Sequence, residues 1–275
     1  MTPTIIITIF IFLFGIVIGS FLNVCILRIP KNETIVTVPS HCMSCGYHLK
    51  WYDNIPLFSY IFLRGRCRKC GKHISLQYPL IEAINGMMYV LIFIRFIIFN
   101  GRGKISFDFT DIISNITYVD AINTAIYCLL FSALLVLTVI DWRTFEIPVG
   151  INIFIGVLGL GHIFLDLDNW LEYVIGLVAV SIPLLLILLI SKGKAIGGGD
   201  VKLMAAAGLL LGWKYILLAF VIGCIIGSII HIIRMKVSGE GKVLAMGPYL
   251  SAGIMISVFA GEYIINWYMS LIGLI

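Results

Sequence analysis

Charged residues are scarce in this sequence, and long stretches of it have none. Asp, Glu, Lys and Arg make up 12% of the 275 positions, whereas hydrophobic residues make up 60%. A soluble domain averages about 25% charged residues, so the composition excludes an ordinary soluble enzyme and predicts a chain that lies in lipid. The formal net charge is +5, and we expect membrane lipid, but no nucleic acid, among its partners.

Several familiar motifs are also absent. The sequence has no Gly-x-Ser-x-Gly and no His-Glu-x-x-His, which argues against a serine peptidase and against a metal peptidase of the common types. The first apolar stretch has no basic residues before it and no small-residue cleavage site after it. We therefore expect a retained first membrane span and not a removable signal peptide.

Apolar stretches of about 20 residues, the length that crosses a bilayer, recur along the chain. The pattern predicts an all-α polytopic membrane protein in three parts: a first transmembrane helix (1–27), a polar loop domain (28–79) and a membrane core (80–275). Glycines at four-residue spacing within the spans indicate close helix packing. We expect about eight transmembrane helices, near 4–27, 80–99, 122–140, 148–165, 171–190, 201–212, 214–233 and 248–270.

Basic residues are distributed unevenly between the two sides of this topology. Cytoplasmic loops of membrane proteins carry an excess of Lys and Arg, and this rule places the N-terminus outside and the loop domain in the cytosol. Of the 19 Lys and Arg residues, all but four fall on the cytosolic side. The four on the outer side are Arg95, Arg102, Lys104 and Lys214.

Four of the seven cysteines form two Cys-x-x-Cys pairs in the polar loop, namely Cys42, Cys45, Cys67 and Cys70. Thiolates at this spacing can occupy two corners of a tetrahedron, and the second pair closes it, as in a zinc ribbon. A closed four-thiolate Zn²⁺ site is structural, and metal binding can supply folding energy that so polar a loop lacks. Four free thiols, or two disulfides, remain the alternatives, and His41 and His48 are possible substitute ligands.

Two aspartates lie at the ends of apolar stretches on the expected cytosolic side. Asp141 ends the run ALLVLTVID, and Asp200 follows Gly197, Gly198 and Gly199 and opens the next apolar segment. Ionisable groups in membrane segments are costly and mostly functional. Two neighbouring carboxylates share one proton, so that one can activate water while the other polarises a peptide carbonyl. The pair predicts an aspartic endopeptidase.

The glycine run before Asp200 suits such a site for two reasons. Without side chains it lets an extended substrate approach the backbone, and glycine can adopt backbone conformations closed to other residues. Taken singly, Asp141 can be a solvated boundary residue and Asp200 a helix N-cap. A transporter with two proton or cation sites and a zinc-stabilised scaffold without chemistry are the competing functions.

The order and spacing of these motifs resemble the type IV prepilin peptidase family of membrane aspartic proteases, which carries a Gly-x-Gly-Asp signature. Met43, Val149 and Met246 depart from the family pattern but touch neither aspartate. The segments that match are Gly19-Ser20-Phe21-Leu22-Asn23-Val24, Arg28-Ile29-Pro30, the four cysteines, Leu49 to Pro56, Tyr78 to Glu82, Ile147-Pro148, Gly197 to Lys202 and Gly247-Pro248.

The resemblance implies that Asp141 and Asp200 are the catalytic pair and that the enzyme lies in the cytoplasmic membrane of a prokaryote. It implies cleavage of short basic leaders from pilin-like precursors just before their hydrophobic stem. It also implies that the new N-terminus is methylated with S-adenosylmethionine. Lys202 is expected beside the catalytic loop, where it can tune Asp200 or extend to the interface. Asp53 and Glu82 are candidate contacts for the leader or the methyl donor, although a solvated loop carboxylate is the plainer interpretation of Asp53.

Overall fold

The computed structural model describes residues 2–36, 39–98, 116–238 and 244–273, and these residues contain helices but no β-sheet. The chain divides into two compact units, Met1–Val136 and Leu137–Ile275, with the division inside one long helix. Much of the outer loop expected near residues 100–120, with Arg102 and Lys104, lies outside the described residues, as does Lys242.

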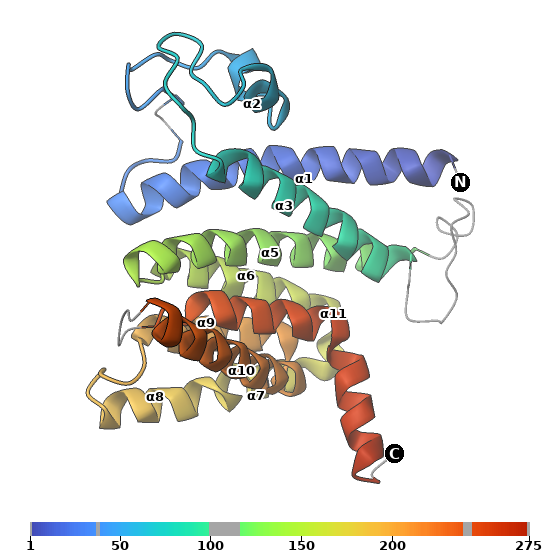
Figure 1. Ribbon diagram of the computed structural model, residues 1–275. Helices are drawn as coiled ribbons and strands as arrows, with labels where there is room; N and C mark the ends of the chain where they lie inside the picture. The colour runs from blue at the N-terminus through green and yellow to red at the C-terminus, as the bar shows by residue number, and fades with distance from the viewer. Residues whose placement is uncertain (1, 37–38, 99–115, 239–243, 274–275) are drawn as a thin grey trace. The chain divides into compact units, whose positions relative to one another are not determined.

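The first unit contains a pair of packed helices joined by the cysteine loop (Figure 1). Its helical elements are α1 (Thr2–Arg28), η1 (Ile29–Lys31), η2 (Trp51–Asn54), α2 (Phe58–Phe62), α3 (Gln77–Phe93), the π-helical turn η3 (Ile94–Ile98) and most of α5 (Tyr118–Thr144). The described residues of the loop between α1 and α3 form two isolated β-bridges, His41 with His48 and Arg66 with His73.

Glycines let α1 and α3 approach closely, as the four-residue spacing predicts. A Cβ on Gly15 would lie 2.7 Å from the Cα of Gly86, and a Cβ on Gly19 would lie 2.7 Å from the Cα of Glu82. The buried side chain of Asn85 donates to the backbone oxygen of Gly15 at 2.7 Å. Small residues therefore set the distance between these helices, and one buried amide fixes their register.

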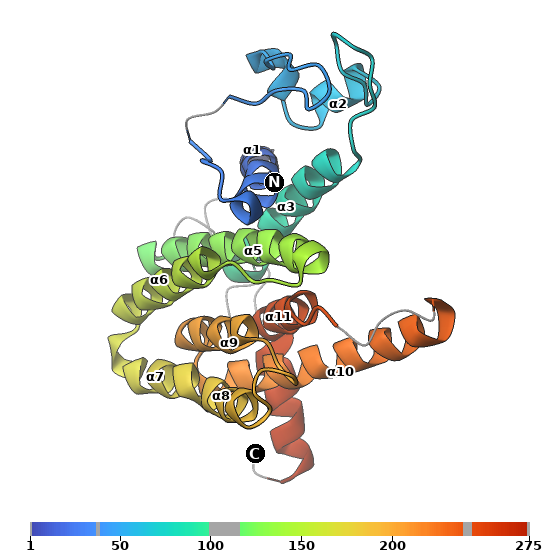
Figure 2. The ribbon, with the colours of Figure 1, turned by 90° about the vertical axis from the view of Figure 1, so that its left-hand side faces the viewer.

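The second unit consists of packed helices (Figure 2). Its helix α9 contacts α6, α7, α8, α10 and α11. After the end of α5 the elements are α6 (Val149–Leu165), η4 (Leu167–Asn169), α7 (Trp170–Ala179), α8 (Ser181–Ile190), α9 (Gly198–Leu211), α10 (Trp213–Ser238) and α11 (Gly247–Leu271). Gly208 of α9 and Gly176 of α7 meet backbone to backbone, where a Cβ on either residue would overlap the other.

All eight expected membrane segments are helical, but they differ in length. Among the described residues, six segments are long and apolar enough to cross a membrane: Pro3–Lys31, Gln77–Ile98, Tyr118–Thr144, Leu167–Ile190, Trp213–Val237 and Gly247–Leu271. Val149–Leu165 is apolar but shorter. At a rise of about 1.5 Å per residue, the 14 residues of α9 fall well short of the membrane core.

The expected span at 171–190 is interrupted and forms two helices, α7 and α8, separated at Val180. Pro183 follows the break, and a proline removes one helical hydrogen bond and clashes with the carbonyl four residues earlier. The hydroxyl of Ser181 donates to the carbonyl of Leu177 and occupies a backbone acceptor near the same point. The sequence pattern is continuous in hydrophobicity and therefore did not show the break.

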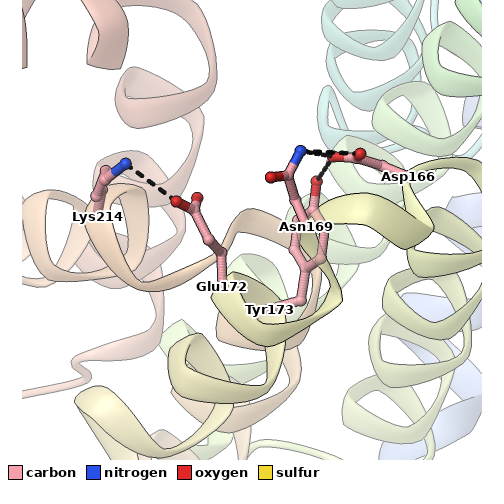
Figure 3. Close-up of polar contacts among 5 residues, drawn as sticks. All are labelled: Asp166, Asn169, Glu172, Tyr173 and Lys214. Atoms are coloured by element: carbon pink, nitrogen blue, oxygen red, sulfur yellow. Dashed lines mark hydrogen bonds and ion pairs between the residues drawn. The ribbon is translucent and has the colours of Figure 1, made fainter.

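Two separate sets of polar contacts lie beyond the C-terminal end of α6, one between α6 and α7 and one between α7 and α10 (Figure 3). Tyr173 donates its hydroxyl to Asp166 at 2.7 Å, and Asn169 donates to the same carboxylate at 3.0 Å. Lys214 forms an ion pair with Glu172 at 3.1 Å. The contacts of Asp166 stabilise the turn between α6 and α7, and we assign a structural role to both sets.

Candidate active site and metal centre

Asp141 occupies a buried position near the C-terminal end of α5. The residue is 4% exposed, and its Oδ2 accepts a hydrogen bond from the backbone N–H of Gly247 at 2.9 Å. Gly247 is the first residue of α11. The free N–H groups and the dipole of a helix N-terminus favour negative charge, so α11 supplies an electrostatic partner for this carboxylate.

Gly247 has no room for a side chain. A Cβ there would lie 2.7 Å from Oδ2 of Asp141 and 2.9 Å from Leu137. The next residue is Pro248, which is tolerated in the first turn of a helix because that position needs no N–H donor. The Gly-Pro pair thus lets the N-terminus of α11 lie directly against the carboxylate of Asp141, with no side chain between them.

Asp200 lies in the first turn of α9, which begins at Gly198 and has Gly197 as its N-cap. Its carboxylate turns back toward the N-cap, so that Oδ2 would be 3.1 Å from a Cβ on Gly197. Asp200 is partly exposed, in contrast to the buried Asp141. The two carboxylates, both in the second unit, lie close enough for the charge on Asp141 to act on Asp200. The structure therefore brings together the two acids that the sequence singled out.

The three glycines before Asp200 serve different purposes. A Cβ on Gly199 would meet the Cβ of Ile147 at 2.8 Å, whereas one on Gly198 would make only ordinary contact, 3.7 Å from Leu188. None of the three has a positive φ, so the expectation of backbone conformations closed to other residues is wrong. Their small size matters here, because it lets α9 begin against the segment that leads into α6.

Asn152 is a polar residue of this site that the sequence analysis missed. It lies in the first turns of α6, is 5% exposed, and places its Nδ2 3.5 Å from the backbone oxygen of Gly199. Its Oδ1 is buried and has no hydrogen-bond partner among the described residues. An amide within the apolar run VGINIFIGV was the available signal. Lys202, by contrast, is exposed on α9.

The four loop cysteines meet at one point in the first unit. Their Sγ atoms all lie within 4.8 Å of one another, with Cys42 and Cys70 at 3.9 Å and Cys45 and Cys67 at 4.0 Å. Zinc–sulfur bonds of about 2.3 Å in a tetrahedron place sulfurs about 3.8 Å apart, so the four thiols fit a Zn²⁺ ion. All seven cysteines are free, and the disulfide alternative is not seen.

The two cysteine turns are built alike. In each, the first cysteine accepts the backbone N–H of a glycine four residues later at 2.9 Å, Gly46 in the first turn and Gly71 in the second. Both glycines adopt a positive φ, +66° and +69°, which is the left-handed region that other residues avoid. His41 and His48 lie near the first turn but outside the cluster.

Asp53 is held inside the cysteine loop. Its carboxylate accepts hydrogen bonds from Nε of Arg68 at 2.7 Å, the hydroxyl of Tyr47 at 3.2 Å and the N–H of Lys50 at 3.3 Å. Burial alone would raise the pKa of Asp53, but these donors outweigh it and hold the pKa below its usual value. Because Arg68 lies between Cys67 and Cys70, Asp53 fastens the second cysteine turn to η2.

Glu82 lies near the start of α3 and contacts the cysteine loop. It is 6% exposed, and its Oε2 accepts the backbone N–H of Leu57 at 2.8 Å. Glu82 and Asp53 both line a cavity of about 1020 Å³ within the first unit. The structure thus places the two candidate contact residues around one cavity. Asp53 is paired there with a cation, Arg68, whereas Glu82 accepts a hydrogen bond from a neutral backbone N–H.

Comparison with known proteins matches both parts of the chain. Residues 13–96 match the bacterial peptidase A24 N-terminal domain, and residues 128–232 match the type IV leader peptidase family. No solved structure matches.

Individual relatives cover most of this chain, and the three described here are each named prepilin leader peptidase/N-methyltransferase. The protein of Xanthomonas campestris is 30% identical over an alignment of 293 positions that covers 94% of this chain and 93% of the relative. The protein of Bacillus subtilis is 28% identical over 94% of this chain and 97% of its own length. The protein of Myxococcus xanthus is 30% identical over 84% of this chain, which spans 64% of that longer relative.

Proposed function

The chain belongs to the type IV leader peptidase family, and we propose that it cleaves the basic leader from pilin-like precursors and then N-methylates the new N-terminus. The observation that supports proteolysis is the pair of carboxylates at two helix N-termini, Asp141 against α11 and Asp200 in the first turn of α9. Among the described residues of the second unit, Asp141 is also the only acid that is buried.

The environments of the two aspartates differ in a way that assigns them roles. The N–H of Gly247 stabilises charge on Asp141, so Asp141 is the base that takes a proton from the attacking water. Asp200 carries the shared proton and donates it to the scissile carbonyl oxygen. The water oxygen bonds to the carbonyl carbon, and collapse of that intermediate breaks the C–N bond as the leaving amine gains a proton.

Asn152 and the glycine run position this pair. The Asn152 amide lies against the Gly199 carbonyl, and its buried Oδ1 is available to an N–H of a substrate backbone. Gly198 leaves space for an extended peptide near Asp200, and Lys202 provides a positive charge two residues beyond Asp200.

The loop cysteines Cys42, Cys45, Cys67 and Cys70 would hold a Zn²⁺ ion with a structural role. A site closed by four thiolates has no open position for water, so the metal would stabilise the loop without taking part in hydrolysis. The first helix (1–27), the loop domain (28–79) and the start of the core (80–275) would serve methyl transfer, and the aspartates further along the core would carry out proteolysis. S-adenosylmethionine would supply the activated methyl group.

The distribution of basic residues supports an orientation in the cytoplasmic membrane of a prokaryote with the N-terminus outside. Lys194 is exposed in the turn after α8, and Lys214 is exposed at the start of α10. In a background without native cysteines, Lys194→Cys should resist a membrane-impermeant maleimide in intact cells, and Lys214→Cys should react. Labelling of Lys194→Cys but not of Lys214→Cys would show that the topology is the reverse of the proposed one.

The test of proteolysis is coexpression in membranes with a pilin-like precursor, followed by intact-mass spectrometry of the product. Asp141→Asn and Asp200→Asn should each abolish cleavage at normal protein levels, because each keeps size and removes charge. Asp168→Asn, which changes an exposed carboxylate outside the site, is the control and should cleave normally. Full cleavage by Asp141→Asn or Asp200→Asn would contradict the catalytic pair and would favour the transporter and scaffold hypotheses.

A further inference from the structure

The first unit contains a cavity large enough for a nucleoside. Its volume is about 1020 Å³, at the upper end of the roughly 300–1,000 Å³ of small-molecule pockets. The end of α1, the start of α3 and the cysteine loop supply its lining, and Cys42 and Cys67 form part of the wall. The cavity's shape therefore depends on the metal-binding turns.

Two buried carboxylates, Glu82 and Asp53, line this cavity. Among the described residues, Glu82 forms no ion pair with a cation. It is held in place by the N–H of Leu57 and by the hydroxyl of Ser20. Asp53, equally buried, is already paired with Arg68. A buried carboxylate that is held by neutral donors and faces a cavity favours a cationic ligand, because burying its charge without a counter-charge is costly.

The cavity lining carries charges of both signs. Arg28, Lys31, Arg68 and Lys72 line the cavity, against the acidic residues Glu33, Asp53 and Glu82. Because Arg68 and Asp53 neutralise each other, the lining keeps both acidic and basic side chains for a ligand. A ligand with both a cationic and an anionic end fits this lining, with the cation at Glu82 and the anion toward the basic side chains.

We propose that this cavity binds the methyl donor, an S-adenosyl sulfonium with an amino-acid end, and that Glu82 binds its cationic part. The inference rests on the proposed function, since N-methylation requires such a donor. Tyr60 and Tyr78 also line the cavity and offer aromatic surface to the adenine or the sulfonium. Asp53 does not bind the donor in this proposal; its ion pair with Arg68 holds the cavity wall in place.

The test measures binding and not turnover. Purified full-length protein in detergent would be titrated with S-adenosylmethionine and, separately, with its neutral thioether product S-adenosylhomocysteine, by equilibrium dialysis. Glu82→Gln should weaken binding of S-adenosylmethionine about tenfold or more, as expected for a lost charge-assisted contact. Asp168→Asn should bind like the wild type. Metal content and melting temperature should be unchanged in both variants, which shows that the wall is intact.

The two ligands separate the parts of the donor. A loss confined to S-adenosylmethionine places the sulfonium at Glu82, and an equal loss for both places the α-ammonium there. Wild-type affinity in Glu82→Gln overturns the inference while leaving methylation in place. Absence of binding by a wild-type protein that still cleaves precursor overturns the inference together with the methyltransferase half of the proposed function, and leaves the peptidase standing.

Discussion

The cysteine loop and the aspartate site are held together by different kinds of contact. The loop depends on short turns, in which a cysteine and a glycine four residues apart share a backbone hydrogen bond. The aspartate site depends on residues far apart in the chain, since Asp141 and Gly247 are 106 positions apart. A local turn is specified by its own few residues, whereas the site exists only when the helices pack. A change that damages one of the two sites should therefore leave the other intact.

The largest effect is expected from Gly247→Ala. The added methyl group would meet Oδ2 of Asp141 at 2.7 Å, so either the carboxylate or α11 must move. A displacement of about 1 Å in a catalytic group can reduce the rate about a hundredfold, and we expect a loss of precursor cleavage of at least that order. Quantitative mass spectrometry of the processed fraction measures it, and zinc content should stay at the wild-type level. Cleavage within twofold of wild type would show that Asp141 does not need this contact.

The converse change is removal of the metal ligands in Cys67→Ser/Cys70→Ser. Structural zinc supplies about 10 kcal/mol or more of apparent binding energy in small metal-dependent folds, so the loop should lose its metal and its fold. Limited proteolysis should then cut within 39–76 while the membrane core remains protected, and zinc should fall from about one per chain to none by elemental analysis. Cys224→Ser, which leaves the cluster untouched, is the control. A loop that remains protected without zinc would contradict the structural role of the metal.

A smaller effect should distinguish two adjacent glycines. Gly199→Ala forces a contact of 2.8 Å with Ile147, whereas Gly198→Ala has ordinary space. Overpacking costs about 1–3 kcal/mol, which corresponds to a loss of cleavage of about tenfold for Gly199→Ala, with Gly198→Ala near wild type. If the two variants behave alike, the glycines act by admitting substrate and not by packing.

The smallest effect is expected from Asp53→Asn. The variant loses the ion pair with Arg68 but keeps the capacity to accept from Tyr47 and Lys50. Because Arg68 is half exposed, we expect only a several-fold faster release of zinc to a chelator, with cleavage unchanged. Tyr47→Phe removes only the 3.2 Å hydrogen bond from the Tyr47 hydroxyl to Asp53, and this variant should release zinc more slowly than Asp53→Asn. Equal rates in Asp53→Asn and the wild type would show that the carboxylate does not support the cysteine turns.

Much of this protein was determined by its sequence alone. Hydrophobic stretches predicted the helices, since a chain in lipid must satisfy its backbone hydrogen bonds internally. The spacing of Cys42, Cys45, Cys67 and Cys70 predicted a metal-binding cluster, because the geometry of each turn is local. Asp141 and Asp200 were identifiable because charge is so rare in the surrounding segments.

Only the tertiary structure decided which partners these residues meet. It placed the start of α11 against Asp141, added Asn152 to the site and divided the expected span at 171–190 into α7 and α8. It also separated Asp53 from Glu82, two acids that the sequence could not rank, because one is paired within the loop and the other faces the cavity without a cationic partner among the described residues. The physical reason is that hydrophobicity and turn chemistry act over a few residues, whereas burial, pairing and close backbone contact depend on which helices meet.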